Sequence, residues 1–97
     1  MFYLNVWLTV QDEAEVENVR GYLAQCTRLS REEPGCVRYE VYHSQAERKQ
    51  FLLCEHWATR EDWERHRTAR AFQEVYHPLV IPRVVREPHI SDLIEPK

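Results

Sequence analysis

Residues 33–42, EPGCVRYEVY, have the pattern of a tight turn that leads directly into a β-strand. Pro34 fixes its own φ, and Gly35 can adopt the positive φ that a tight reversal needs. From residue 36 the side chains alternate, which predicts two strand faces. One face is expected to hold Val37, Tyr39 and Val41, and the other Cys36, Arg38, Glu40 and Tyr42. The turn ends a helical pattern and the strand begins a hairpin, so this stretch joins a helix to a β-hairpin.

The elements around this stretch follow from hydrophobic periodicity, capping residues and prolines. We expect strands at residues 3–10, 36–42, 50–57 and 89–94, and helices at 12–32, 59–69 and 71–85. Pro78 and Pro82 should kink or segment the last helical piece, and Pro88 should end it. The order βαββαβ predicts an α+β fold of the ferredoxin-like kind, a four-stranded antiparallel sheet with helices on one face. Ninety-seven residues are expected to form one domain, 1–97.

The first strand has an aliphatic side and a mixed side. The aliphatic stripe comprises Leu4, Val6, Leu8 and Val10, and Leu52 and Cys54 are expected to extend it on the third strand. We expect the stripe on the sheet face that the helices leave open, because they can cover only one face. Several exposed aliphatic side chains would be costly, so a second copy should cover them and form a homodimer. The mixed side, with Asn5 and Trp7, is expected to form a pocket wall.

Composition and charge exclude several classes of partner. The formal net charge is −3 with no basic block, so we expect no nucleic acid. No apolar run is long enough to span a membrane, and the apolar N-terminus lacks the features of a signal peptide. The three cysteines are odd in number and have no C-x-x-C spacing, so they are expected to be reduced thiols of a cytoplasmic protein.

No cofactor or metal motif is found. The only glycines, Gly21 and Gly35, do not form a phosphate-binding loop. The five histidines show neither H-x-x-x-H nor H-E-x-x-H spacing, so no metal site is expected.

A set of aromatic, amide and imidazole side chains is expected to surround a pocket between the sheet and the helices. The set comprises Asn5, Trp7, Trp57, Trp63, His66, Phe72, Tyr76 and His77. Aromatic walls with a few polar groups suit a planar aromatic ligand. The alternative for each aromatic residue is simple core packing, and for His66 it is a hydrogen-bonded structural role.

The chain resembles the antibiotic biosynthesis monooxygenase (ABM) superfamily. The resemblance lies in the E-P-G-C-x-x-Y-E opening at residues 33–40, the E-x-W of Glu55 and Trp57, and the later His66 and Phe72. It implies a dimeric α+β barrel and oxidation of a small aromatic quinol or polyphenol by O₂ without a metal or flavin. In such a reaction His66 is the expected base and Asn5 the expected hydrogen-bond donor. The other six residues of the set are expected to bind the substrate.

Other functions stay open within the resemblance. Many relatives carry a second histidine just before the Phe, where this chain has Ala71, which also suits a non-catalytic ligand-binding or stress-associated dimer. Haem-degrading relatives carry an Asn and a Trp where this chain has Asn5 and Trp57. Their haem-binding His aligns near Tyr76, one residue before His77, which is a turn of about 100° on a helix. Isomerisation of a small carbonyl compound is a further alternative, since it also uses an acid/base histidine.

Overall fold

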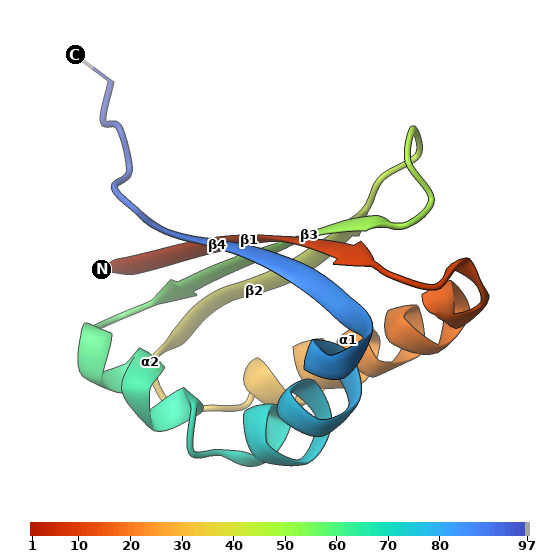
Figure 1. Cartoon of the computed structure of the whole chain (residues 1–97). Coiled ribbons are helices and arrows are strands. Elements are labelled where there is room, and N and C mark those ends of the chain that lie inside the picture. Colours follow the sequence, from red (N-terminus) through yellow and green to blue (C-terminus); the bar gives the residue numbers. More distant parts are fainter. Residues whose placement is uncertain (97) are drawn as a thin grey trace.

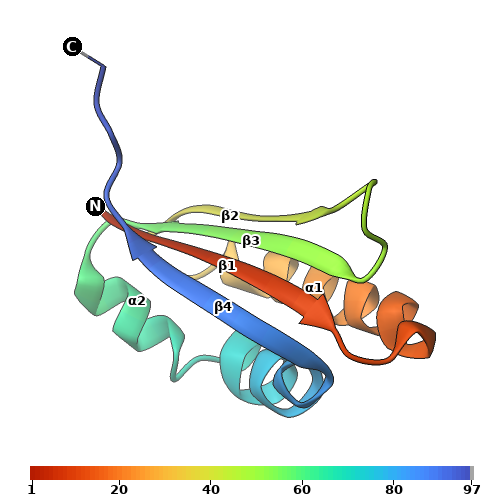
Figure 2. The ribbon, with the colours of Figure 1, turned by 45° about the horizontal axis from the view of Figure 1, so that its top comes forward.

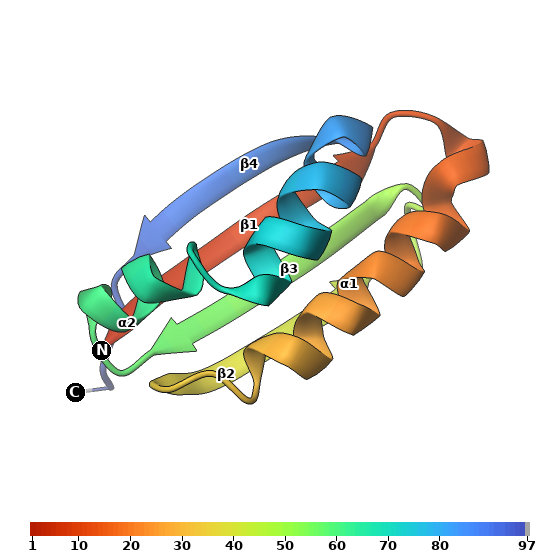
Figure 3. The ribbon, with the colours of Figure 1, turned by 90° about the horizontal axis from the view of Figure 1, so that it is seen from below.

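The computed structural model describes residues 1–96 of the chain. Its four strands are β1 (Phe2–Val10), β2 (Cys36–His43), β3 (Gln50–Trp57) and β4 (Val84–Ser91). All neighbouring pairs are antiparallel, and the strand order is β2-β3-β1-β4 (Figure 3). This arrangement confirms the predicted ferredoxin-like α+β fold.

The helices lie together against one face of this sheet, and the opposite face is bare in both side views (Figures 1 and 2). In chain order they are η1 (Glu13–Glu15), α1 (Val16–Ser30), α2 (Arg60–His66), η2 (Ala71–Val80) and η3 (Ile81–Arg83). We call the two sides of the sheet the covered face and the open face. Among residues 1–96, no helix is both long enough and apolar enough to cross a membrane.

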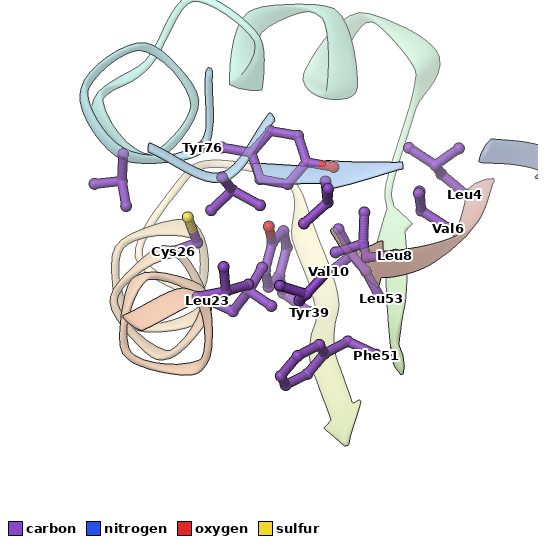
Figure 4. Close-up of a cluster of buried hydrophobic side chains, with 14 of the residues drawn as sticks. Leu4, Val6, Leu8, Val10, Leu23, Cys26, Tyr39, Phe51, Leu53 and Tyr76 are labelled. Carbon is purple, nitrogen blue, oxygen red and sulfur yellow. The ribbon is translucent and has the colours of Figure 1, made fainter. Parts of the chain in front are cut away.

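The covered face carries the aliphatic stripe of β1. Leu4, Val6, Leu8 and Val10 are buried and pack in one cluster with the buried stripe of α1, which includes Leu23 and Cys26 (Figure 4). The prediction that this stripe lies on the open face is therefore wrong. Alternation shows which residues share a face of the sheet, but it does not show which of the two faces the helices cover. The aliphatic stripe of α1 buries more apolar surface against an aliphatic strand face than against a mixed one.

The open face carries the mixed side of β1. Asn5 pairs with Cys54 and Trp7 pairs with Leu52 across the β1–β3 ladder, so these four side chains share the open face. Leu52 and Cys54 thus belong with the mixed side, and the prediction that they extend the aliphatic stripe is wrong. Phe51 and Leu53 are the β3 residues that continue the covered face.

The turn before β2 forms as expected, with Gly35 at a φ of 81°. A β-bulge follows it, because the register with β3 shifts between Cys36 and Arg38. The extra residue is Val37, which is exposed, while Cys36 packs against the core. The predicted alternation therefore holds from Arg38 onward and is wrong for Cys36 and Val37.

The segment after α2 differs most from the prediction. The helix ends at His66 instead of near residue 69, and η2 is a π-helix in which the N–H of Ile81 donates to the carbonyl of Tyr76. The wider π turn accommodates Pro78, whose ring would clash with the preceding turn of an α-helix. Pro88 does not end a helix but lies within β4, which begins at Val84. β4 is an edge strand, where proline is tolerated.

Candidate functional site

A cavity of about 360 Å³ lies between the covered face and the α2–η2 segment. Its walls are Leu4, Tyr39, Glu55, Trp63, His66, Arg67, Phe72, Tyr76, Arg86, Pro88 and Ile90. Four of these form one row across the sheet, since Leu4 pairs with both Ile90 and Glu55, and Glu55 pairs with Tyr39. All four strands therefore contribute to the floor of the cavity, and α2 and η2 provide its roof.

Four of the eight residues expected at a pocket line this cavity: Trp63, His66, Phe72 and Tyr76. Trp57 is fully buried behind it, and its ring centre lies 4.7 Å from that of His66. His77 is exposed on η2 and contacts the ring of Phe72 from outside the cavity.

Asn5 and Trp7 lie on the other side of the sheet. The amide Nδ2 of Asn5 donates to the hydroxyl of Ser91 at 3.3 Å, and Trp7 faces outward from the open face. The prediction that all eight residues surround one pocket is therefore wrong for Asn5 and Trp7, and also for His77, which lies outside the cavity. For Asn5 and Trp7 the error has the same cause as the misplaced stripe, because both assign the two sides of β1 to the wrong faces.

A buried carboxyl–imidazole cluster stands at the inner end of the cavity. His66 Nδ1 lies 2.8 Å from Oε1 of Glu33, and His66 Nε2 lies 3.7 Å from Oε1 of Glu55. Glu55 Oε1 also accepts a hydrogen bond of 2.9 Å from the indole Nε1 of Trp57. We call Glu33, His66 and Glu55 the acid–histidine cluster. Two of its members, His66 and Glu55, line the cavity.

The turn of residues 33–35 holds this cluster in place. Its Gly35 carbonyl accepts from the N–H of Ala58, just before α2. A Cβ at Gly35 would lie 2.2 Å from side-chain atoms of Asp62 in the first turn of α2. Only glycine allows α2 to pack this closely onto the turn, and its positive φ also favours glycine. This contact fixes the position of Glu33 relative to His66 one turn further along α2.

Burial shifts the proton affinities of all three members of the cluster. It raises the pKa of Glu55 to about 7, against the opposing effects of the Trp57 hydrogen bond and the positive charge of Arg86. Burial also raises the pKa of Glu33 to about 7 and lowers that of His66 to about 4. At neutral pH the imidazole is therefore uncharged, and the two carboxyls are the groups that exchange protons.

Two phenols complete the polar lining of the cavity. Burial raises the pKa of Tyr39 well above its usual value and that of Tyr76 to about 12, so both hydroxyls keep their protons at neutral pH. The Tyr76 hydroxyl accepts a 2.8 Å hydrogen bond from Nε of Arg86. The cavity thus combines apolar walls with hydroxyl donors and a buried proton acceptor, which suits binding and deprotonation of a phenol.

Sequence patterns did not reveal every member of the site. The sequence did indicate that Glu55 is unusual, because a carboxylate between Leu53 and Trp57 on a buried strand face needs a partner. Nothing in the sequence indicated a role for Arg86, because the predicted helix extended through residue 85 and the predicted strand began only at residue 89, whereas β4 begins at Val84. Glu33 was recognised only as part of the turn motif, and its contact with His66 depends on tertiary packing.

The residues required for haem binding do not come together. Trp57 is buried behind the cavity, His77 lies outside it, and Asn5 faces the opposite side of the sheet. Within residues 1–96, no group of three or more His, Cys, Asp or Glu side chains is arranged so that it could hold a metal ion.

Comparison with known proteins links this chain to a family. A family model described as antibiotic biosynthesis monooxygenase matches residues 1–77. None of the curated proteins matches the chain in sequence.

Several solved structures share the fold. A candidate antibiotic biosynthesis monooxygenase from Nitrosomonas europaea is 21% identical with a TM-score of 0.88, and the alignment covers 98% of this chain and 100% of that one. A protein of unknown function from Bacteroides thetaiotaomicron, described as a possible oxidoreductase, is 24% identical with a TM-score of 0.87, covering 95% and 96%. At these identities the structures show a common fold.

Proposed function

The chain belongs to the antibiotic biosynthesis monooxygenase family, and from this membership and its cavity we propose that it is a cofactor-independent monooxygenase. Its proposed substrates are O₂ and a small aromatic, either a quinol or a polyphenol. The observation that carries this proposal is the acid–histidine cluster at the inner end of an aromatic-lined cavity. Such a cavity can hold a planar ring and remove a proton from its hydroxyl group away from bulk water.

A quinol itself supplies the electrons for this reaction. One quinol and one O₂ give one hydroxyquinone and one water, so no external reductant is required. The role of the protein is to generate the electron-rich anion of the substrate, exclude water and place O₂ against the ring. Tyr39 and Tyr76 provide hydroxyl donors that can stabilise the anion, a role that the sequence had suggested for Asn5.

Glu55 is the proposed proton acceptor of the cluster. Its pKa of about 7 lies about three units below that of a phenol, whereas the pKa of His66, about 4, lies about six units below. The base whose pKa lies closer to that of the phenol accepts the proton more readily. His66, the base suggested by the sequence, is then proposed to position Glu55 and to connect it to Glu33.

Oxygen uptake with a panel of hydroquinones and naphthohydroquinones tests the proposal. Replacing Glu55 by Gln should lower kcat/KM by roughly 100-fold or more, because Gln keeps the shape of the side chain but cannot accept the proton. Glu47→Gln, in the exposed β2–β3 connection, is the matched control and should keep the native rate. The proposal fails if no quinol consumes O₂, or if Glu55→Gln retains full activity.

An isomerase is the second candidate, favoured by the same cluster. A carboxylate that removes a proton from a phenol can also remove one from the carbon next to a carbonyl group. The two reactions differ in their need for O₂. Turnover of a small carbonyl compound under anaerobic conditions, lost in Glu55→Gln, would support the isomerase over the monooxygenase.

We also propose that the protein is a homodimer whose interface is the open face. This face exposes large apolar side chains next to polar ones: Trp7 is 38% exposed, Tyr42 46% and Val85 58%. A two-fold partner would bury them and complete the α+β barrel implied by the resemblance. Residues 92–96 extend away from the body and could reach the partner (Figure 1). Asn5 and Trp7 are then proposed to serve the interface.

A reducing location, the cytoplasm, is proposed from the cysteines. All three thiols are unpaired, and Cys26 and Cys54 are buried. Burial raises the pKa of Cys26 to about 12, so this thiol is not a reactive thiolate.

A further inference from the structure

Two arginines at the cavity set it apart from a simple aromatic pocket. Arg67, just after α2, and Arg86, on β4, both line the cavity while remaining exposed to solvent. A residue that lines a cavity and is also exposed must lie at its opening. The opening is therefore positively charged, whereas the inner end is lined by the carboxyl of Glu55.

Neither arginine forms an ion pair with an Asp or Glu side chain in the part of the chain that the structure describes. Six other arginines form ion pairs with Asp or Glu, but none of the ion pairs found among residues 1–96 includes Arg67 or Arg86. Exposed arginines without partners are common on protein surfaces. Arg67 and Arg86 differ from most of them because both line the cavity.

Aromatic side chains orient both guanidinium groups. Arg67 lies 5.2 Å from the ring centre of Trp63 and 5.9 Å from that of Phe72. Arg86 lies 5.4 Å from the ring centre of Tyr76 and uses its Nε to donate to the Tyr76 hydroxyl. Among residues 1–96 no hydrogen bond occupies the terminal nitrogens of either guanidinium group, and paired terminal nitrogens can bind a carboxylate through two parallel hydrogen bonds.

We propose that the cavity binds an aromatic acid: a planar ring with a hydroxyl at one end and a carboxylate at the other. The carboxylate is held by Arg67 and Arg86 at the opening, and the hydroxyl points inward to Glu55 and His66. The inner end offers no positive charge to a carboxylate, because the imidazole of His66 is uncharged at neutral pH, so the ligand enters with its carboxylate at the opening. This inference rests on the proposed function and narrows its substrate class, because the acidic group selects among quinols and phenols.

A pair of probes with the same shape and different charge tests the inference. We choose 6-hydroxy-2-naphthoate and its neutral carboxamide, which carry the two groups at opposite ends and are not quinols. Calorimetric titration of the native protein should show the acid binding roughly tenfold more tightly than the amide, a factor that matches one charge-assisted interaction. This preference should shrink as salt is added.

Variants assign the preference to the two arginines. Arg67→Gln and Arg86→Gln should each reduce the preference, and the double variant should bring it to within about twofold, since each removes one charge-assisted contact. Arg70→Gln is the control, because it removes an equal charge from the same segment but its ion pair with Glu74 lies outside the cavity. Should Arg86→Gln fail to fold, Arg67→Gln and the salt titration of the native protein still decide the question.

The outcomes separate this inference from the proposed function. Equal binding of acid and amide, no binding of either, or an undiminished preference in Arg67→Gln with no salt dependence overturns the inference. Oxygen uptake with a neutral quinol would meanwhile leave the monooxygenase proposal intact. Conversely, arginine-dependent binding of the acid without any oxygen uptake supports the inference and removes the monooxygenase proposal.

Discussion

The two faces of the sheet come from the same strands but have different chemistry. On the covered face β1 presents Leu4, Val6 and Leu8, all buried under the helices. On the open face the same strand presents Tyr3, Asn5 and Trp7, which pair with β3 and β4 residues of mixed polarity. A purely aliphatic strand face thus marks the intramolecular core, whereas the aromatic and polar face is the one that the helices leave uncovered.

The charges on the two faces differ in the same way. The carboxyl of Glu55 on the covered face has its pKa raised by burial. On the open face, hydrogen bonds from Tyr42 and then Arg38 lower the pKa of Glu40. Adjacent strands therefore carry one carboxyl whose pKa is raised and one whose pKa is lowered, and the direction depends on which side of the sheet each faces.

Replacing Val6 with Asp should give the largest effect, because Val6 is fully buried at the centre of the covered face. An unpaired carboxylate there should cost about 4 kcal/mol or more and prevent folding. Far-UV circular dichroism and thermal unfolding measure this. Asn5→Asp is the control on the same strand, and it should fold because its side chain faces the open side. A folded Val6→Asp protein with native stability would contradict the assignment of the faces.

Replacing Trp7 with Glu should have an intermediate effect. The side chain lies on the open face, so the subunit should fold but lose the proposed two-fold contact. Light scattering at micromolar concentration should show dimers for the unmodified chain and monomers for the variant. A monodisperse monomer of the unmodified chain would refute the dimer, and an unfolded variant would show that Trp7 belongs to the core.

Glu55→Gln should change how stability depends on pH. The pKa of Glu55 rises from 4.5 to about 7 on folding, so its contribution is fully present below pH 4.5 and is lost as pH rises through about 7. The full contribution is about 3 kcal/mol. Glu33 acts in the same direction. His66, with its pKa lowered to about 4, acts in the opposite one, and its contribution is lost as pH falls below 6.5.

Urea unfolding at pH 5 and pH 7.5 measures this effect. The native protein should lose stability towards the higher pH, and Glu55→Gln should lose much less, because only Glu33 and His66 then remain with opposing contributions. Glu40→Gln on the open face is the comparison variant and should leave the slope largely unchanged or steepen it slightly. An identical slope in native protein and Glu55→Gln would mean that Glu55 is ionised in the folded state.

Asn5→Ala should have the smallest effect. Its hydrogen bond to Ser91 is long, and its side chain faces away from the cavity. We expect a stability change within about 0.5 kcal/mol and little change in kcat/KM for any quinol that turns over. A large loss of turnover without loss of stability would restore the catalytic role that the sequence suggested for this residue.

The sequence was sufficient for the fold and for part of the site, for identifiable reasons. Alternation and capping reveal strands and helix starts because they are local, as the side chain of Thr59 capping the N–H of Asp62 illustrates. Trp63 and His66 were found because helical spacing puts them near one face, and the resemblance to the family also pointed to His66 and Phe72. The choice of sheet face, the π-helix around Pro78 and the Glu33–His66 contact depend on packing between distant segments, so local patterns do not show them.

The position of β1 has a consequence for the synthesis of the protein. β1 is synthesised before the other three strands but lies inside the sheet, where it pairs with β3 and with β4. The pair of Tyr3 with Ser91 can therefore form only after residue 91 has been synthesised. Until the last strand leaves the ribosome, β1 has an unpaired edge and the cavity lacks Arg86, Pro88 and Ile90. Pairing over such a separation is slow, so the nascent chain should depend on chaperones that shield exposed strand edges. A ribosome-stalled chain ending at residue 83 should remain sensitive to protease, whereas one extended by a linker beyond residue 97 should become resistant.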